Sequence, residues 1–229
     1  MIGSFDKLPP EMQIEEIRPY FESLNHKRFQ LFIKRFFDIL IAFIVLLILS
    51  PIMLISAIFV AATSKGPIFY LQKRIGRYGK PFSIIKFRTM VQNADKIGAQ
   101  VTVGENDPRI TKVGHFLRVT RIDEFPQMIN ILKGDMSLVG TRPEVPKYVE
   151  KYSPEMMATL LLPPGASGEA SLKYRYENEM LKDKEDPEQY YIETILVDKM
   201  AVNLEYTRNF SILRDISILI RTVWCVIKK

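Results

Sequence analysis

The chain has 229 residues, a formal net charge of +6 and a single cysteine, Cys225. This length allows one domain, or one domain with a membrane anchor. A single cysteine excludes an internal disulfide and fits a reducing compartment, and we interpret Cys225 as a packing or interfacial residue rather than a nucleophile.

Residues 1–33 are typical of a helical, amphipathic lead-in, which prolines interrupt at Pro9, Pro10 and Pro19. No pattern in this segment indicates whether it packs on the rest of the protein or recruits a partner.

An apolar run of about 24 residues, from Ile39 to Ala62, contains no charge. As a helix it would be ~36 Å long, enough to cross a hydrocarbon core of ~30 Å. Ser50 and Pro51 stand near its centre. The proline leaves the carbonyl of Leu47 without its usual helical partner, and the serine hydroxyl can donate to such a freed carbonyl. The run therefore predicts a membrane-inserted helix that bends at this pair.

Basic residues flank the apolar run on both sides. Lys34 and Arg35 precede it. Four more follow it, at Lys65, Lys73, Arg74 and Arg77. The positive-inside rule favours the cytoplasmic side for both ends, which a helix bent at Ser50 and Pro51 can satisfy and a straight span cannot. We expect a re-entrant helix-break-helix over residues 34–62, with a straight span and a buried helix of a soluble core as the alternatives.

Positive charge is concentrated directly after this run. Residues 63–121 hold twelve lysines or arginines against three acidic residues, an excess of nine. Such a block suits anionic lipid headgroups or a phosphate-rich substrate. Nucleic acid is a weaker option and we expect no such partner, because the block has no recognisable nucleic-acid module and the insert would hold it at the bilayer.

The central part of the chain alternates between strand and helix patterns. Two β-prone runs around a turn at residues 75–80 predict a β-hairpin over 67–88. Residues 90–108 are polar and predict a loop, and a short basic helix is expected over 110–121. The next predicted helix covers 124–133, and Gly134 can close it.

The C-terminal part predicts a loop at 163–168 and helices over 187–208 and 211–227. The last helix is amphipathic, and Trp224 near its end suits a membrane interface, although packing on its own domain is an equally open alternative. These elements predict a mostly helical α+β protein. We divide it into an amphipathic lead-in (1–33), a re-entrant membrane hairpin (34–62), a catalytic domain (63–208) and a C-terminal amphipathic interfacial helix (209–229).

Carboxylates and guanidinium groups gather around the start of the 124–133 helix. Asp123 and Glu124 are adjacent, and Arg118, Arg121 and Arg142 flank them. Arginine forks hold phosphate oxygens, carboxylates bind Mg²⁺ beside phosphates, and a carboxylate can attack phosphorus to form an acyl phosphate. The plainer interpretation is that Asp123 is a helix N-cap and Glu124 a first-turn charge.

Several segments together resemble the small monotopic phosphoglycosyl transferases of the bacterial sugar transferase family. The matching segments are KRFFDILIAFIVLLILSPIMLI (34–55), GPIFYLQKRIGRYGKPFSIIKFRTM (66–90), DPRITKVGHFLR (107–118), DEFPQMINILKGDMSLVGTRPE (123–144), PPGASGEASLKYR (163–175) and DKMAVNLEY (198–206). They follow the family's order, and their joint occurrence is far more specific than any one of them.

The resemblance implies an activity. Such enzymes move a sugar-1-phosphate from a UDP-sugar to polyprenyl (undecaprenyl) phosphate through a covalent phosphosugar-aspartate intermediate and release UMP, at the start of surface-glycan synthesis. By this likeness Asp123 is the nucleophile and the ligand of Mg²⁺, Glu124 is its catalytic partner, and Arg118 and Arg142 bind phosphate. The family's Ser-Pro break matches Ser50-Pro51.

Four further residues are weaker site candidates. Lys86 and Arg88 could bind substrate phosphate or a lipid headgroup. Tyr174 and Arg175 could line the donor pocket, and the alternative is a structural salt bridge with Glu177 or Glu179.

The resemblance also implies a location and partners. We expect the cytoplasmic face of a bacterial inner membrane, contact with membrane phospholipids, a UDP-sugar donor and a polyprenyl phosphate acceptor; a homodimer stays an open option. Ala166 and Ser167 stand where the family usually has a branched residue and threonine, which leaves the sugar undetermined. The rival interpretations are a membrane-tethered, non-catalytic scaffold and a conventional glycosyl transferase that releases UDP.

Overall fold

The computed structural model describes residues 3–92, 94, 107–182 and 184–228. Within them the protein is mostly helical with two small sheets, which confirms the predicted class. The helices are α1 (Arg18–Asn25), α2 (Arg28–Thr63), α3 (Lys112–Val119), α4 (Gln127–Lys133), α5 (Pro146–Val149), α6 (Glu169–Lys173), α7 (Glu177–Lys182), α8 (Pro187–Tyr190), α9 (Leu196–Arg208) and α10 (Ile212–Ile227). The strands are β1 (Phe69–Ile75), β2 (Pro81–Phe87), β3 (Ser137–Val139) and β4 (Gly165–Ser167).

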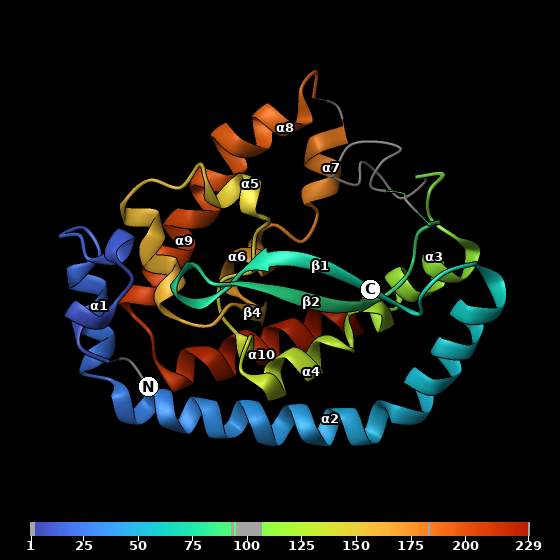
Figure 1. Cartoon of the computed structure of the whole chain (residues 1–229), viewed down its shortest axis with the longest axis horizontal. Helices are drawn as coiled ribbons and strands as arrows, with labels where there is room; N and C mark the ends of the chain where they lie inside the picture. The colour runs from blue at the N-terminus through green and yellow to red at the C-terminus, as the bar shows by residue number, and fades with distance from the viewer. Residues whose placement is uncertain (1–2, 93, 95–106, 183, 229) are drawn as a thin grey trace.

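Helix α2 runs along the lower edge of the molecule and bends upward in its C-terminal part (Figure 1). The helix is continuous through Pro51, so the expected break is a bend within one helix, and it begins at Arg28, earlier than predicted. The hydroxyl of Ser50 donates to the carbonyl of Leu47 at 2.8 Å, as expected for the carbonyl that the proline leaves free.

Both ends of α2 contact the same domain. Near its start, the ammonium of Lys34 donates to Asp215 at 2.6 Å and to the Val139 carbonyl at 2.8 Å. Near its end, Val60 packs in a small core with Phe87 and Leu117.

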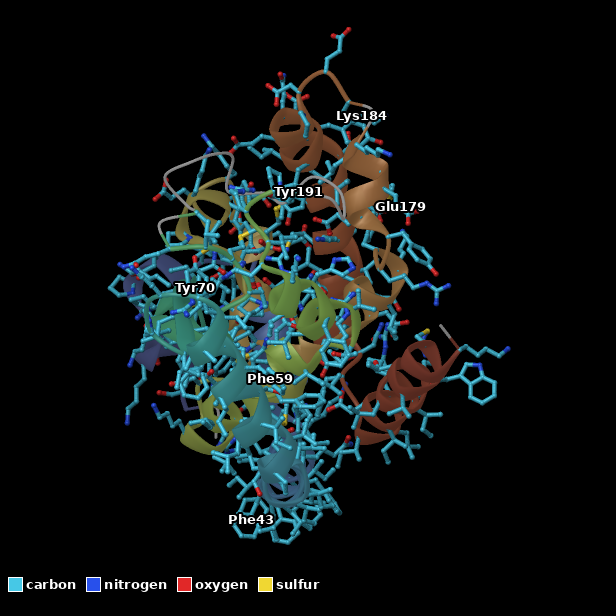
Figure 2. The ribbon with its side chains drawn as sticks, turned by 90° about the vertical axis from the view of Figure 1, so that its right-hand side faces the viewer. Phe43, Phe59, Tyr70, Glu179, Lys184 and Tyr191 are labelled. Atoms are coloured by element: carbon cyan, nitrogen blue, oxygen red, sulfur yellow. The ribbon has the colours of Figure 1, made fainter. Side chains whose placement is uncertain are left out.

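Between these ends the apolar side chains of α2 are exposed. Only 11% of its most apolar 18-residue window is buried, which argues against the core helix of a soluble protein. Figure 2 shows Phe43 at the extremity opposite to the charged residues Glu179 and Lys184. The exposed side chains are Phe36, Phe37, Ile39, Leu40, Phe43, Ile44, Leu47, Ile48, Ile52, Leu54, Ile55, Ile58 and Phe59.

The predicted hairpin is confirmed: β1 and β2 pair antiparallel from Phe69↔Phe87 to Ile75↔Pro81. A second, unpredicted pair is formed by β3 and β4, which run parallel in a small buried sheet. Strand β4 lies in the segment 163–168 that we expected to be a loop. The short, glycine-rich sequence has no strand pattern of its own, and the pairing depends on the close approach of Gly165 to Gly140.

The lead-in and the C-terminal helices complete the main core. Buried lead-in residues, among them Met12, Ile17 and Leu24, pack in one cluster with Ile131, Leu161 and Phe210, so much of the segment 1–33 packs on the domain. The predicted helix over 187–208 is present as α8 and α9, joined by a π-helical turn, η7 (Tyr191–Ile195).

Helix α10 has two different faces. Asp215 and Ile218 are buried against the domain, which confirms that the helix packs on it. The opposite face exposes apolar side chains, namely Leu213, Ile216, Ile220, Val223 and Trp224.

Candidate active site

The two adjacent carboxylates lie in a 3₁₀ turn, η5 (Ile122–Glu124), that precedes α4. Arg121 introduces this turn in the left-handed region, with φ of 60°, and α4 begins only at Gln127 with Pro126 as its N-cap. The N-cap interpretation of Asp123 is therefore wrong. The proline at the N-cap position displaces the start of the α-helix, and the carboxylates stay outside it.

Glu124 holds two cations. Its Oε1 atom accepts from the ammonium of Lys86 at 2.7 Å and from Nη2 of Arg142 at 3.0 Å. These two charges hold the pKa of the Glu124 carboxyl well below its usual range, against the opposite effect of burial. Glu124 is thus ionised at neutral pH, and Lys86 and Arg142 are brought together at one point.

Asp123 has a different environment from its neighbour. Its side chain is 8% exposed, and burial together with the charge of Glu124 raises the pKa of its carboxyl to about 6. Lys86 and Arg118 act in the opposite direction but only in part. The two carboxyl groups therefore differ in pKa: Glu124 is an anion at neutral pH, while Asp123 titrates around pH 6.

Arg142 is placed by a segment that is hydrogen-bonded on both sides. Before it, Gly165 N donates to the Thr141 carbonyl at 2.8 Å, next to the parallel pair of β3 and β4. After it, Arg74 Nη1 donates to the Pro143 carbonyl at 2.9 Å and Ile75 N donates to the Glu144 carbonyl at 3.0 Å. The side chain of Arg142 is left partly exposed, with an accessibility of 41%.

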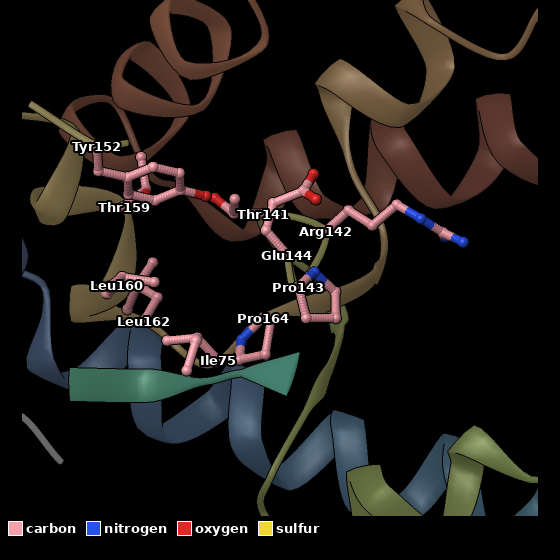
Figure 3. A pocket seen from close by; sticks show the side chains of 10 residues that line it. All are labelled: Ile75, Thr141, Arg142, Pro143, Glu144, Tyr152, Thr159, Leu160, Leu162 and Pro164. Atoms are coloured by element: carbon pink, nitrogen blue, oxygen red, sulfur yellow. The ribbon is translucent and has the colours of Figure 1, made fainter. Parts of the chain in front are cut away.

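A small cavity lies beside this segment (Figure 3), lined by Ile75, Thr141, Arg142, Pro143, Glu144, Tyr152, Thr159, Leu160, Leu162 and Pro164. Its volume of about 10 Å³ matches roughly one water molecule, so it is too small to hold a sugar nucleotide.

Arg118 lies at the end of α3 and donates from Nε to the Thr89 hydroxyl at 2.9 Å. Burial lowers the pKa of its guanidinium, and the nearby charge of Asp123 acts in the opposite direction. Its charge thus acts on Asp123, as the sequence predicts for a residue of the same site.

Three of the predicted basic residues bind backbone carbonyls away from the two carboxylates. Arg88 donates from Nη2 to the Ser64 carbonyl at 2.7 Å and so closes the end of α2. Arg35 donates to the carbonyls of Ile131 and Leu132 at the end of α4, at 2.7 and 3.0 Å. Lys34, described above, is buried. The carbonyls that Arg88 and Arg35 bind lie at helix ends, where such groups are left free, and a cation stabilises them. These positions favour structural roles over contact with phosphate or lipid.

Tyr174 and Arg175 also contact residues outside the carboxylate pair. The Tyr174 hydroxyl donates to Asp198, and Arg175 Nη1 lies 3.3 Å from Cys225 Sγ. Neither contact is the salt bridge with Glu177 or Glu179 that was the alternative; among the described residues Glu177 pairs with Lys199 instead.

The sequence interpretation missed several residues around Arg142. Glu144 accepts from the Tyr191 hydroxyl at 2.8 Å, and Lys199 pairs with Glu177 close to the Tyr191 ring. Of these residues, only Glu144 could have been suggested by the sequence, because it stands two residues after Arg142.

The carboxylate set fits one mode of magnesium binding. Among the described residues there is no cluster of three or more potential side-chain ligands. Mg²⁺ commonly uses one or two carboxylates and completes its shell with substrate phosphates and water. Because Glu124 Oε1 is engaged by two cations, Asp123 is the carboxylate that fits this role.

Comparison with known proteins gives a consistent result. The model of the family described as bacterial sugar transferase matches residues 29–229. A Bacillus subtilis relative described as a putative undecaprenyl-phosphate N-acetylgalactosaminyl 1-phosphate transferase is 41% identical over 73% of the chain and 91% of its own length.

Two longer relatives match a larger part of the chain. UDP-N-acetylgalactosamine-undecaprenyl-phosphate N-acetylgalactosaminephosphotransferase of Aeromonas hydrophila is 38% identical, and UDP-glucose:undecaprenyl-phosphate glucose-1-phosphate transferase of Escherichia coli is 39% identical. Each match covers 84% of this chain, which spans 43% and 39% of those relatives.

Proposed function

We propose, because this chain belongs to the bacterial sugar transferase family, that it transfers a sugar-1-phosphate from a UDP-sugar to undecaprenyl phosphate. The named relatives use such acceptors, and their names differ in the sugar. The product would be an undecaprenyl-diphosphate sugar, the first membrane-bound intermediate of a surface glycan, made at the cytoplasmic face of the inner membrane.

The proposed reaction has two displacements. In the first, a carboxylate oxygen of Asp123 attacks the phosphorus that carries the sugar, the bond from this phosphorus to the UMP oxygen breaks, and UMP leaves. In the second, a phosphate oxygen of the acceptor attacks the same phosphorus and releases the Asp123 carboxylate. A nucleophile on the protein allows the soluble donor and the lipid acceptor to react in turn. Mg²⁺ held by Asp123 and the diphosphate would neutralise charge.

The convergence of Lys86 and Arg142 on Glu124, one residue from the buried Asp123, is the observation that supports this proposal. In the proposed reaction, the donor phosphates would bind these two cations and so come close to Asp123. A diphosphate can accept the bonds that Lys86 and Arg142 donate to Glu124 in the free protein. The two cations would then balance the charge of the diphosphate and would still have acceptors.

The test is a measurement of the nucleotide product. Detergent-solubilised protein would be incubated with Mg²⁺, undecaprenyl phosphate and a panel of UDP-sugars. We expect UMP release that depends on the lipid for continued turnover and stops on chelation of Mg²⁺. Release of UDP would instead indicate a conventional glycosyl transferase, and no release from folded protein with any donor would favour a non-catalytic scaffold.

We also propose that α2 enters the membrane and returns to the side from which it came. The contacts of Lys34 and Val60 with one and the same domain support this topology, because a straight span would separate them across the bilayer. The exposed apolar side chains between them would lie in the hydrocarbon region.

Replacement of both Ser50 and Pro51 by alanine should shift the protein toward a straight span. Alanine restores the backbone donor that proline lacks and removes the bend, a change of ~3 kcal/mol in a helix interior. Cysteines introduced at His26 and Lys65 of a Cys225→Ser protein would report the sides of the membrane. We expect both to be labelled from the cytoplasm in the parent and only one in the Ser50→Ala/Pro51→Ala variant, with Ile52→Ala as control; unchanged labelling would contradict the prediction.

The rate of the first displacement should rise with pH around pH 6. The attacking group is the carboxylate form of Asp123, and its pKa is raised to about 6, chiefly by burial, so the reactive fraction grows from pH 5 to pH 7. The measurement is kcat/KM for the UDP-sugar across this range, which reports the free protein. A profile that is flat down to pH 4.5 would contradict this assignment.

A further inference from the structure

Tyr191 and Glu144 form a buried hydrogen bond beside Arg142. The two residues are 3% and 7% exposed, and the hydroxyl donates to Glu144 Oε1 at 2.8 Å. Burial and the charge of Glu144 raise the pKa of Tyr191, so its hydroxyl stays protonated and remains a donor.

The place of Tyr191 in its helix is unusual. It begins the π-helical turn η7, which separates α8 from α9 in an otherwise continuous helix. Such turns are rare and occur frequently at functional sites. The ring of Tyr191 packs at 4.8 Å from the ring of Tyr148 and lies 4.9 Å from the ammonium of Lys199, so its orientation is fixed from two sides.

Glu144 needs such a donor. Its carboxylate is nearly inaccessible to water, and the nearest cation, Arg74, is 4.0 Å away. Buried carboxylates without partners are costly, so an unbonded Glu144 would compete for any cation within reach. Arg142 is two residues away and is already within the field of Glu144.

We propose that Tyr191 is a positioning residue, which occupies Glu144 so that the guanidinium of Arg142 stays directed toward Glu124 and the incoming donor phosphate. This inference rests on the proposed function, in which Arg142 binds that phosphate. Arg142 then binds Glu124 and Tyr191 binds Glu144, and Arg142 leaves Glu124 only for the substrate.

The test is a mutant cycle on UMP release. Tyr191→Phe removes one oxygen atom, and we expect kcat/KM for the UDP-sugar to fall ~10-fold. In an Arg142→Ala protein the same change should have no further effect, because Tyr191 acts through Arg142. Adding Glu144→Gln to Tyr191→Phe should restore most of the activity, because the amide has no charge with which to attract Arg142.

The control is Tyr148→Phe, which alters the ring partner of Tyr191 without touching Glu144 and should leave kcat/KM unchanged. The inference is overturned if Tyr191→Phe matches the wild type, if its loss persists in full in the Arg142→Ala background, or if Glu144→Gln gives no rescue. The affinity for UDP is measured for the same set of variants. If the wild type shows no turnover, that result counts against the proposed function, and the binding data still decide the role of Tyr191.

Discussion

Asp123→Asn should reduce UMP release by a factor on the order of 10³ or more, because an amide cannot form the phosphosugar intermediate on which both of the proposed displacements depend. Water cannot readily act as the nucleophile in place of this carboxylate, because Asp123 is 8% exposed and water has little access to its position. The measurement is single-turnover UMP release with the productive donor. Asp135→Asn changes a carboxylate just beyond α4 and serves as the matched control, with turnover close to that of the wild type.

The same variant should fold at least as well as the wild type. The folded protein raises the pKa of Asp123 above its unfolded value, so ionisation of this group opposes folding, and stability is lost as pH rises through about 6. Asparagine removes that penalty. We therefore expect the thermal midpoint of Asp123→Asn to equal or exceed that of the wild type at pH 8. Normal UMP release from the variant would refute Asp123 as the nucleophile.

Lys34→Met should destabilise the protein by ~3–5 kcal/mol, because it leaves the buried carboxylate of Asp215 without its cation. The two side chains are 7% and 9% exposed and are joined at 2.6 Å, and the Tyr206 hydroxyl alone would continue to donate to Asp215. In a chain of this length we expect the thermal midpoint to fall by on the order of 10 °C in detergent micelles.

An exposed ion pair in the same chain provides the matched control. Glu15 and Arg18 lie at 2.9 Å with side-chain accessibilities of 78% and 43%, so Glu15→Gln should shift the midpoint very little. The combination Lys34→Met/Asp215→Asn should recover much of the loss, because no unpaired charge remains. A midpoint for Lys34→Met equal to that of Glu15→Gln would contradict the role of Lys34 as a buried connection.

Elements whose residues specify them locally were predictable from the sequence. The unbroken apolar run gave α2, the alternating β-prone residues gave the hairpin of β1 and β2, and the spacing of apolar residues gave α10. The carboxylates of the candidate site could be proposed from the sequence, because Asp123 and Glu124 occur in a motif whose parts are adjacent in the chain.

Features that depend on distant partners were not predictable in the same way. From the sequence, Lys34 and Arg35 are interpreted only as positive-inside charges that precede an apolar run, but they bind groups 96 to 181 residues away. The position of Glu124 beside Lys86 requires the hairpin to fold against the turn η5. The role of Tyr191 depends on a π-helical turn, for which the sequence has no pattern that we recognised.

The buried pair of Lys34 and Asp215 has a consequence for biogenesis. The two residues are 181 positions apart, so α2 leaves the ribosome long before its partner on α10 exists. At ~5–20 residues per second, the interval is roughly 10–35 s. During that time Lys34 has no buried carboxylate partner. The contact that fixes the start of α2 to the domain therefore forms only after α10 has been synthesised.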